Sequence, residues 1–469
     1  MTPSPKPRIG VLALTLELYE TLSPALRPGR ERWLRGAVIP ALEEFAEVRF
    51  DRAVFRAEDV AGAVRAYESA GLDALVVIFL SYSPSQVSLP ALKRTRLPIL
   101  VWNTQELLAV DESFTPAQMT DNHGVHGTMD LCNCLLREGV PFEYVTSHLS
   151  DRDSLAELKD WFAAAAATSA MRGLRVGLLG YPFPGMGDFA VDTTYLASTL
   201  GCHWCALSME QYVQRAAGAE AGAVKRLMDE YRRLYKVATD LTPADLDATA
   251  RAELAMRALV AENRLGAMSY QFLAFGEDER VETLPFVAAS RLMADGVGFA
   301  GEGDVVGAAG CWLLNRLQPP AGFCEVFTID FAGEGLLMSH MGEANVAMAR
   351  PDGEVEIVAR ATPITRTRGR QLLLVPAFRS GEATLAALCQ GPQRRWRLVV
   401  GRVRIEDFGP LPALAVPHFK AAPLDGDVRK FLTAYAKAGG PHHAAICFGD
   451  ATRPLRFAAN LLNADYCEV

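Results

Sequence analysis

Hydrophobic residues in the first third of the chain occur in short unbroken runs, separated by stretches with helical spacing. The runs are Arg8–Leu14, Ala74–Leu80 and Leu97–Trp102, and a helical spacing covers Trp33–Val48. Continuous apolar runs of this length predict strands that are buried on both faces. Because the second and third runs end in polar segments and helices lie between the runs, the pattern predicts a parallel, doubly wound sheet.

A second unit of the same kind is predicted further along the chain. An alanine-rich helical stretch, Leu155–Ala170, closes the first unit, and the apolar run Leu174–Leu179 begins the next. Two long helical stretches follow, Gln211–Ala238 and Pro243–Glu262. We therefore expect two Rossmann- or flavodoxin-like α/β domains, at 1–172 and 173–318. Ligands of such sheets bind beyond the carboxyl ends of the strands.

The pattern changes after Pro319-Pro320, where apolar and polar residues begin to alternate. The alternating segments are Phe323–Phe331, Glu354–Arg360, Gln371–Val375, Ala383–Cys389 and Arg395–Glu406. Alternation predicts strands with one buried face, as in an antiparallel sheet or a small barrel. A helix at Asp427–Lys437 and a short strand after it complete a C-terminal, mostly antiparallel β domain over 319–469. The predicted fold class is therefore α/β with an added β-barrel-like domain.

Composition narrows the classes of function. The chain has 469 residues, a formal net charge of -8 and 22% charged residues. This balance argues against a non-specific nucleic-acid binder, because such a protein needs a dense basic face. The sequence lacks the ~20 consecutive apolar residues of a membrane helix and lacks the pattern of a signal peptide.

Its nine cysteines form no even framework, so we expect reduced thiols in the cytoplasm. The spacing of Cys202 and Cys205 suits redox or metal chemistry, but a structural zinc site needs a second such pair.

The candidate chemistry consists of histidine clusters and two carboxylates. Five of the eight histidines fall in three clusters: His123 and His126, His340, and the adjacent His442 and His443. The last pair follows Gly439-Gly440-Pro441 at the start of a short strand. Because neighbours on a strand point to opposite faces, we expect an irregular backbone there if both rings serve one site.

Glu302 lies in the glycine-rich segment Gly301-Glu302-Gly303-Asp304, which is also compatible with a tight turn. A phosphate loop is disfavoured because two acids would repel the ligand. Strand alternation puts Glu325 on a face with Phe323, Phe327 and Ile329, which is costly unless the acid is paired or binds a metal.

Two further structural alternatives remain open for these residues. Arg316 is a candidate partner for Glu325 in a buried salt bridge. Alternation also places His340 on a face with Leu336 and Met338, as expected for a core histidine. Two carboxylates and two imidazoles nevertheless suit a six-coordinate divalent ion such as Mn²⁺, with open positions for water or substrate oxygens.

Several short segments together resemble one known family. The segment RLM…GFAGEGD at 291–304 is similar to RLM…GYGFAGEGDW of L-arabinose isomerases. Four shorter matches keep the same order: VTSH at 145–148, FCEVF at 323–327, SHMGE at 339–343 and GPHH at 440–443. His126-Gly127 also resembles the family's Ala-His-Gly. The matches extend across nearly the whole chain.

The resemblance implies an aldose–ketose isomerase of the arabinose/fucose isomerase superfamily. Such an enzyme interconverts an open-chain aldose and a ketose through a cis-enediol. The metal ligands would be Glu302, Glu325, His340 and His443, with Mn²⁺ as cofactor or Co²⁺, Mg²⁺ or Fe²⁺ instead. Glu302 and Glu325 would share the roles of base and acid.

The resemblance also implies how the sugar substrate is held. Substrate contacts would come from His126, Met186, Phe275 and His442. The family forms hexamers or tetramers in which neighbouring subunits complete the active sites. We therefore expect a homo-oligomer, with the His123/His126 loop as the element that reaches across.

The chain departs from the family outside the predicted metal ligands. Leu16 replaces a polar glutamine after the first strand, Val305 replaces a tryptophan, and the segment Gly180–Asp188 lacks the family's basic residues. A pocket that loses a hydrogen-bond partner discriminates strongly against the original substrate, so we expect a sugar other than L-arabinose. Two alternatives stay open: a non-catalytic sugar-binding or regulatory protein, and a metal-dependent epimerase or lyase acting on a modified sugar.

Overall fold

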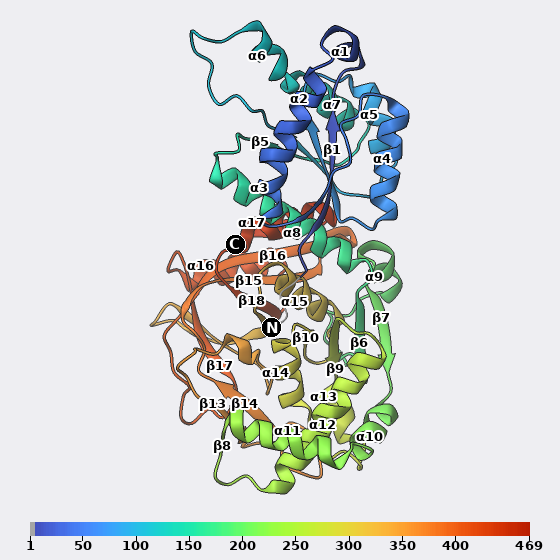
Figure 1. Ribbon diagram of the computed structural model, residues 1–469. Coiled ribbons are helices and arrows are strands. Elements are labelled where there is room, and N and C mark those ends of the chain that lie inside the picture. Colours follow the sequence, from blue (N-terminus) through green and yellow to red (C-terminus); the bar gives the residue numbers. More distant parts are fainter. Residues whose placement is uncertain (1–4) are drawn as a thin grey trace. The chain divides into compact units, whose positions relative to one another are not determined.

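The computed structural model describes residues 5–469, whose helices and strands are labelled in Figure 1. The chain divides into two compact units, residues 5–169 and 170–469. Each unit has its own parallel sheet, and the second unit also contains antiparallel strands. The predicted boundary at 318/319 falls inside the second unit and stays a prediction.

The unit 5–169 is built on a five-stranded parallel sheet with the strand order β2-β1-β3-β4-β5. This is the strand order of flavodoxin-like folds. The strands are β1 Arg8–Leu14, β2 Glu47–Arg49, β3 Ala74–Phe79, β4 Ile99–Asn103 and β5 Glu143–Thr146. The α-helices are α1 Glu17–Leu22, α2 Leu26–Trp33, α3 Ile39–Glu43, α4 Ala57–Ser69, α5 Ser85–Leu92, α6 Pro116–Asp121, α7 Gly124–Arg137 and α8 Arg152–Met171, the last of which runs into the second unit.

Both faces of this sheet are covered by helices. All six residues of β3 are buried, as its unbroken apolar sequence predicts. One core packs β1, β3 and β4 against α4, α5 and α7. Figure 1 shows α2 and α3 on one side of β1 and α4 and α5 on the other.

The unit 170–469 contains a four-stranded parallel sheet with the order β10-β9-β6-β7. Its strands are β6 Arg175–Leu179, β7 His203–Leu207, β9 Ala267–Tyr270 and β10 Gly298–Ala300. Its α-helices are α9 Thr193–Leu200, α10 Met209–Ala217, α11 Ala221–Leu234, α12 Pro243–Glu262, α13 Phe272–Gly276, α14 Phe286–Ala294 and α15 Val305–Leu317. The loops that follow β6, β9 and β10 all lie at the carboxyl edge of this sheet.

The remaining strands form a closed antiparallel barrel and a small sheet. The barrel order is β15-β18-β11-β12-β17-β16, and pairing of β15 with β16 closes it. Its strands are β11 Ala321–Asp330, β12 Gly335–Ser339, β15 Gly381–Gln390, β16 Trp396–Ile405, β17 His418–Pro423 and β18 His443–Phe448. Strand β19 (Asp465–Glu468) adds to β16 in parallel, β8 (Lys236–Val237), β13 (Val355–Ala359) and β14 (Leu372–Pro376) form the small sheet, and α16 (Val428–Lys437) and α17 (Thr452–Leu461) complete the chain.

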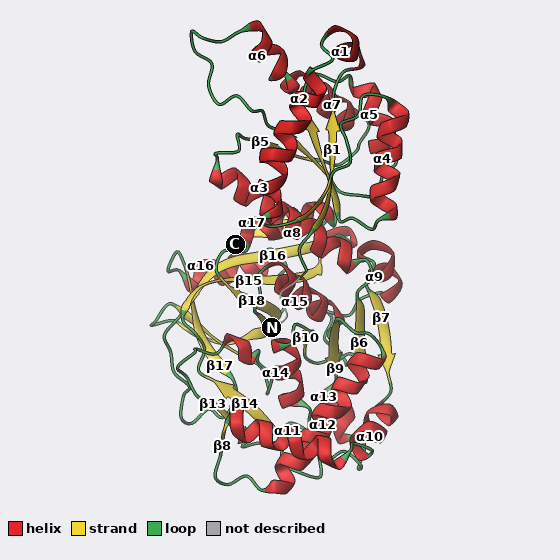
Figure 2. Cartoon of the chain, in the orientation of Figure 1, coloured by secondary structure: helices red, strands yellow, loops and turns green. Residues whose placement is uncertain are grey.

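Helix α15 connects the barrel to the parallel sheet. It packs against β9 and β10 on one side and against β11, β15 and β18 of the barrel on the other. Figure 2 shows these two groups of strands in yellow within the same unit. The predicted fold class, two parallel α/β sheets with an antiparallel β-barrel, is thereby confirmed.

Some sequence predictions need correction in detail. The stretch Gln211–Ala238 is not one helix, because α10 ends at Ala217, α11 begins at Ala221 and residues 236–237 join a sheet. The end of Trp33–Val48 is likewise extended, since Glu47–Arg49 forms β2. A strand pairing supplied from elsewhere in the chain overrides the local helical spacing in both places.

A β-bulge changes the predicted faces of β11. The pairing with β12 shifts between Val326 and Thr328, so Phe327 has no partner and is 47% exposed. Val326 and Ile329 then both pack against the barrel core. The prediction that Glu325, Phe327 and Ile329 share one face is therefore wrong, because a bulge inserts one residue into the alternation.

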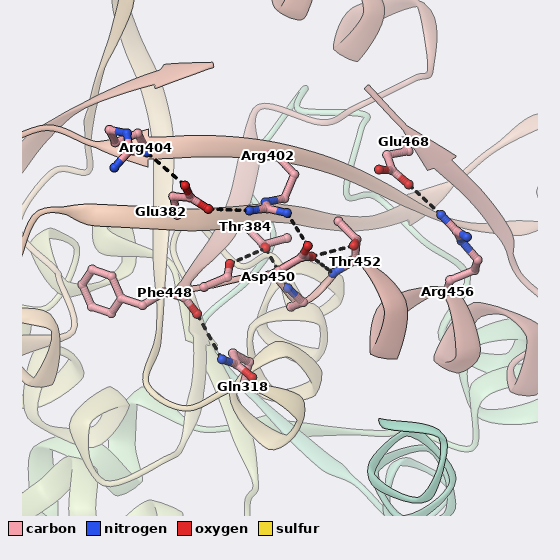
Figure 3. A network of polar contacts seen from close by, with 12 residues as sticks. Gln318, Glu382, Thr384, Arg402, Arg404, Phe448, Asp450, Thr452, Arg456 and Glu468 are labelled. Carbon is pink, nitrogen blue, oxygen red and sulfur yellow. Dashed lines mark hydrogen bonds and ion pairs between the residues drawn. The ribbon is translucent and has the colours of Figure 1, made fainter. Parts of the chain in front are cut away.

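A polar network fixes the far end of β18. Figure 3 shows Thr384 beside the segment that follows β18. Its hydroxyl donates to the carbonyl of Gly449 at 2.8 Å and accepts from the amide of Ala451 at 2.9 Å. Arg402 lies between Asp450 and Glu382, to which its Nη2 donates at 2.9 Å. These contacts tie the segment after β18 to β15 and β16, on the opposite side of β18 from its pairing with β11.

Candidate metal centre

Glu302 lies at the carboxyl edge of the parallel sheet, directly after β10. Its φ of +61° is in the left-handed region, which is uncommon for a residue with a side chain and is typical of functional sites. Its glycine neighbours permit two close approaches. A Cβ on Gly301 would lie 2.4 Å from Cε1 of His340, and a Cβ on Gly303 would lie 2.6 Å from Cα of Pro182.

The barrel places a second acid and a histidine on one face. Glu325 of β11 pairs directly with His443 of β18 in the antiparallel ladder. Directly opposed residues project to the same side, with Cβ atoms about 4.5–5.5 Å apart. Nε2 of His443 lies 3.5 Å from Oε2 of Glu302, so the barrel and the parallel sheet meet at this point.

Asp304 holds the ring of His443. Its Oδ1 accepts from the backbone amide of Gly307 at 2.7 Å and so caps α15, while its Oδ2 lies 3.0 Å from Nδ1 of His443. A ring that donates through Nδ1 leaves Nε2 free to face Glu302. This is the arrangement that orients metal-binding histidines through a carboxylate.

His340 is held in the same way by Glu343. Its Nδ1 lies 2.6 Å from Oε2 of Glu343, and the other oxygen of that buried acid accepts from the hydroxyl of Tyr270. The His340 ring contacts Phe323, with ring centres 4.6 Å apart, and lies 5.8 Å from the ring of His443. Leu336 and Met338 face the barrel core instead, so the prediction that His340 shares their face is wrong. The strand ends at Ser339, and the turn that follows redirects the histidine.

His442 is the third imidazole at this point. Its Nδ1 lies 2.5 Å from Oδ2 of Asp188, and its Nε2 lies 3.7 Å from Oε2 of Glu302. Strand β18 begins only at His443, so His442 precedes it, and the two rings lie 4.0 Å apart. The expected irregular backbone is confirmed.

The donor set fits a divalent cation. The Nε2 atoms of His340 and His443 are buried and have no hydrogen-bond partner in the protein. A buried ring nitrogen without a partner is costly, and a metal ion would satisfy it. One oxygen of Glu302 and one nitrogen each of His442 and His443 lie within 4.8 Å of one another, and this is the one such group among residues 5–469.

Mutual contacts shift the pKa values of these groups. Burial alone would raise the pKa of Glu302, but His442 and His443 outweigh it and lower the pKa to about 2. Burial disfavours the charged ring of His443, yet Asp304 and Glu302 raise its pKa to about 9. The contact with Glu302 also raises the pKa of His442. The centre thus carries an ionised carboxylate and readily protonated imidazoles, and a metal would displace their protons.

The structure brings only some of the predicted site residues together. Glu302 and His443 lie together, with Glu325 and His340 beside them. Met186 lies on the half-exposed loop between β6 and α9, whereas Phe275 is fully buried, edge-on to Tyr212 and Tyr270. His126 belongs to α7 in the unit 5–169. Arg316, the alternative partner for Glu325, lies over the ring of Trp312.

Sequence reasoning missed the carboxylates that hold the three rings. Asp304 and Glu343 stand inside the GEGD and SHMGE segments, but Asp188 lies more than 250 positions from its partner His442. The first two carry a usable signal, because an acid close in sequence to a candidate ligand is a candidate partner for its other nitrogen. The sequence alone carries no such signal for Asp188.

Comparison with known proteins identifies the family. The model of the L-arabinose isomerase central domain matches residues 190–317, and the model of the L-arabinose isomerase C-terminal domain matches residues 320–465. This chain belongs to the L-arabinose isomerase family. Membership agrees with the resemblance that the short motifs carry.

The relatives in this family are distant. An L-arabinose isomerase from Nocardioides sp. is 29% identical over 394 residues, covering 78% of this chain and 74% of the relative. One from Acidothermus cellulolyticus is 27% identical over 417 residues, covering 84% and 80%. A solved periplasmic solute binding protein from Actinobacillus succinogenes with bound D-allose aligns at 15% identity, covering 66% of this chain and 92% of that chain, with a TM-score of 0.16, which is too low to support an inference.

Two further observations concern the rest of the molecule. Within residues 5–469, no helix is both long enough and apolar enough to cross a membrane. Cys202 is buried and its Sγ lies 3.7 Å from the carbonyl of Met171, while Sγ of Cys205 lies 3.6 Å from the carbonyl of His203. All nine cysteines are free thiols.

Proposed function

We propose that this chain is a metal-dependent aldose–ketose isomerase. The observation that carries the proposal is the convergence of Glu302 with histidine Nε2 atoms whose Nδ1 atoms are each held by a carboxylate. Ion pairs that only stabilise the fold do not explain three oriented rings, nor the buried Nε2 atoms of His340 and His443 that lack a hydrogen-bond partner. Membership of the L-arabinose isomerase family supports the same conclusion.

The residues that would hold the metal are Glu302, Glu325, His340 and His443, with His442 beside them. A bound Mn²⁺, Co²⁺, Mg²⁺ or Fe²⁺ would polarise the substrate carbonyl and acidify the neighbouring C–H. Carboxylate and imidazole ligands together suit ions of this kind. His340→Ala and His442→Ala should be compared for Mn²⁺ affinity, since the larger loss identifies which ring is a ligand.

Glu302 and Glu325 would carry the proton transfers. One carboxylate removes the proton from C2 of the open-chain aldose and returns it to C1, while the other moves the hydroxyl proton from O2 to O1. The intermediate is a cis-enediol, and the product is the ketose. The lowered pKa of Glu302 keeps its carboxylate ionised, which both a metal ligand and a base require.

The substrate would be a free sugar other than L-arabinose. The loop Gly180–Asp188 between β6 and α9 has no basic residue, and its Tyr181 hydroxyl instead donates to Glu277 at 2.6 Å. His442 and Met186 are the substrate contacts that this unit can supply. The contact predicted for Phe275 would require the core around this buried ring to open. The contact predicted for His126 would have to come from the unit 5–169.

A panel of aldoses and ketoses incubated with Mn²⁺ tests the function. We expect one or more aldose–ketose pairs to interconvert, with solvent deuterium incorporated at the carbon that accepts the proton. Product without any deuterium would contradict an exchanging enediol base. Metal binding without turnover of any sugar would favour a non-catalytic, sugar-binding protein.

We also propose that the protein is a cytoplasmic homo-oligomer, a hexamer or a tetramer. Free thiols throughout agree with a reducing compartment. The molar mass in solution, measured by light scattering, tests the assembly. A monomer at micromolar concentration would contradict it.

A further inference from the structure

The loop between β6 and α9, residues 180–192, is tied to the candidate metal centre at its beginning. The amide of Phe183 donates to the carbonyl of Glu302 at 2.8 Å. Gly303 allows the chain at Tyr181 and Pro182 to pass directly against it, since a Cβ there would lie 2.6 Å from the Tyr181 carbonyl oxygen. The loop therefore has a fixed starting point beside Glu302.

Further along, the loop holds His442 through Asp188. One carboxylate oxygen, Oδ2, accepts from the backbone amide of His442 at 3.1 Å and lies 2.5 Å from Nδ1 of its ring. Contact with both the backbone and the ring of one residue fixes the side-chain rotamer as well as the tautomer. With Nδ1–H donating to Asp188, Nε2 is the atom that faces Glu302.

The next residue restricts the same rings from another side. Phe189 is 4% exposed, and its ring stacks on His443 at 5.4 Å with an interplanar angle of 3°. It also lies 5.8 Å from the ring of His442 at an angle of 41°. Asp188 and Phe189 thus hold the His442 ring by a hydrogen bond and by packing.

We propose that Asp188 is a positioning residue that fixes the imidazole of His442 with Nε2 directed at the reaction site. His442 remains 36% exposed, so its ring can meet a substrate oxygen while Asp188 prevents it from rotating away. The role of Nε2 toward substrate rests on the proposed function. The fixing of the ring does not.

A double-mutant cycle tests the positioning. Asp188→Ala should lower kcat/KM by about 10- to 100-fold, mainly through kcat, because the ring nitrogen that faces the reaction site is no longer held in place. Asp188→Asn should cost less, since its amide oxygen still accepts from Nδ1–H. In a His442→Gln background Asp188→Ala should cost nothing further. An equal loss in both backgrounds would overturn the proposal.

Asp192→Ser is the matched control. Asp192 lies in the same loop, caps α9 and pairs with Arg394 on the surface, with Oδ2 3.1 Å from the Arg394 nitrogen. Serine keeps a capping oxygen and removes the same charge. We expect its kcat/KM to stay within about twofold of the parent protein, as expected for a surface substitution that keeps the cap.

A readout without turnover separates this proposal from the proposed function. In the full-length chain labelled with ¹⁵N-histidine and prepared without added metal, His442 is assigned by its loss in His442→Gln. At a pH high enough to make the ring neutral, we expect a single Nδ1–H tautomer in the parent protein and in Asp192→Ser, and a mixture in Asp188→Ala. A spectrum unchanged by Asp188→Ala would overturn the positioning role. A fixed ring in a protein that turns over no sugar would leave it standing and would contradict only the proposed function.

Discussion

The two sides of the candidate metal centre are built by different means. On the sheet side, Glu302 has a left-handed backbone and lies between two glycines. A side chain at either glycine would collide with His340 or Pro182. On the barrel side, Glu325 and His443 are opposed on β11 and β18, and their relative position follows from the unshifted register of this antiparallel pair. The sheet side is thus specified locally, by a few adjacent residues, whereas the barrel side is specified by pairing that extends far from the site.

This contrast has a practical meaning for mutagenesis. Changes close to Glu302 should act directly on the chemistry or on the metal. Changes that affect the barrel should act on stability first, because the register is held by many contacts. The following predictions test this difference.

Glu302→Gln should have the largest effect. The amide keeps the shape of the side chain but cannot act as a base, and it is a weak metal ligand. We expect turnover to fall by about 10²–10⁴-fold. Stabilisation by Mn²⁺ in thermal unfolding should also disappear. Glu468→Gln, which changes a surface partner of Arg456, serves as the control. Full activity in Glu302→Gln would contradict the assignment of this residue.

Asp304→Asn should weaken metal binding by about 10- to 100-fold while the fold is retained. Asparagine can still cap α15, but it no longer offers a charge to the His443 ring. Mn²⁺ affinity by calorimetry and circular dichroism of the same sample are the measurements. An unchanged affinity would show that His443 does not need Asp304 to face the metal.

Metal affinity should rise with pH. His443 has a pKa raised to about 9, so at neutral pH a metal must displace its proton. Each unit of pH between 6.5 and 8.5 should tighten Mn²⁺ binding by up to about tenfold. Glu302, with its pKa lowered to about 2, adds no competition in this range. A flat profile, or binding without proton release in calorimetry, would contradict the ligand role of His443.

Thr384→Val should have the smallest effect on the metal. It removes a buried hydroxyl that bonds the segments after β18, which should lower the free energy of unfolding by about 1–3 kcal/mol. Mn²⁺ affinity should stay within about twofold, because Thr384 lies on β15 and the β11–β18 pairing remains intact. A large loss of affinity at unchanged stability would mean that the barrel side is as local as the sheet side.

Much of the fold followed from local patterns. The runs that became β1 and β3 and the helix at Pro243–Glu262 need only hydrophobic spacing and local caps to be recognised. The bulge at Phe327 did not follow, because it depends on how β12 pairs with β11. Helical spacing at 236–238 was overridden for the same reason, by pairing with β13.

The candidate site shows the same division. Glu302, His340 and His443 were recognised from residue type and from short motifs. The partners of the rings were missed, because Asp188 and His442 meet only once the parallel sheet and the barrel are folded against each other. The direction of His340 was also wrong, since the turn that redirects it lies beyond the end of its strand.

The shared carboxylate of Asp304 links two events that are normally separate. One oxygen accepts the Gly307 amide in the first turn of α15, and the other holds a ring that would bind the ion. Any change in the charge of that ring is felt by the hydrogen bond that starts the helix. Hydrogen exchange at the Gly307 amide should therefore slow when the cation enters, which gives a backbone signal of occupancy that requires neither a sugar nor turnover.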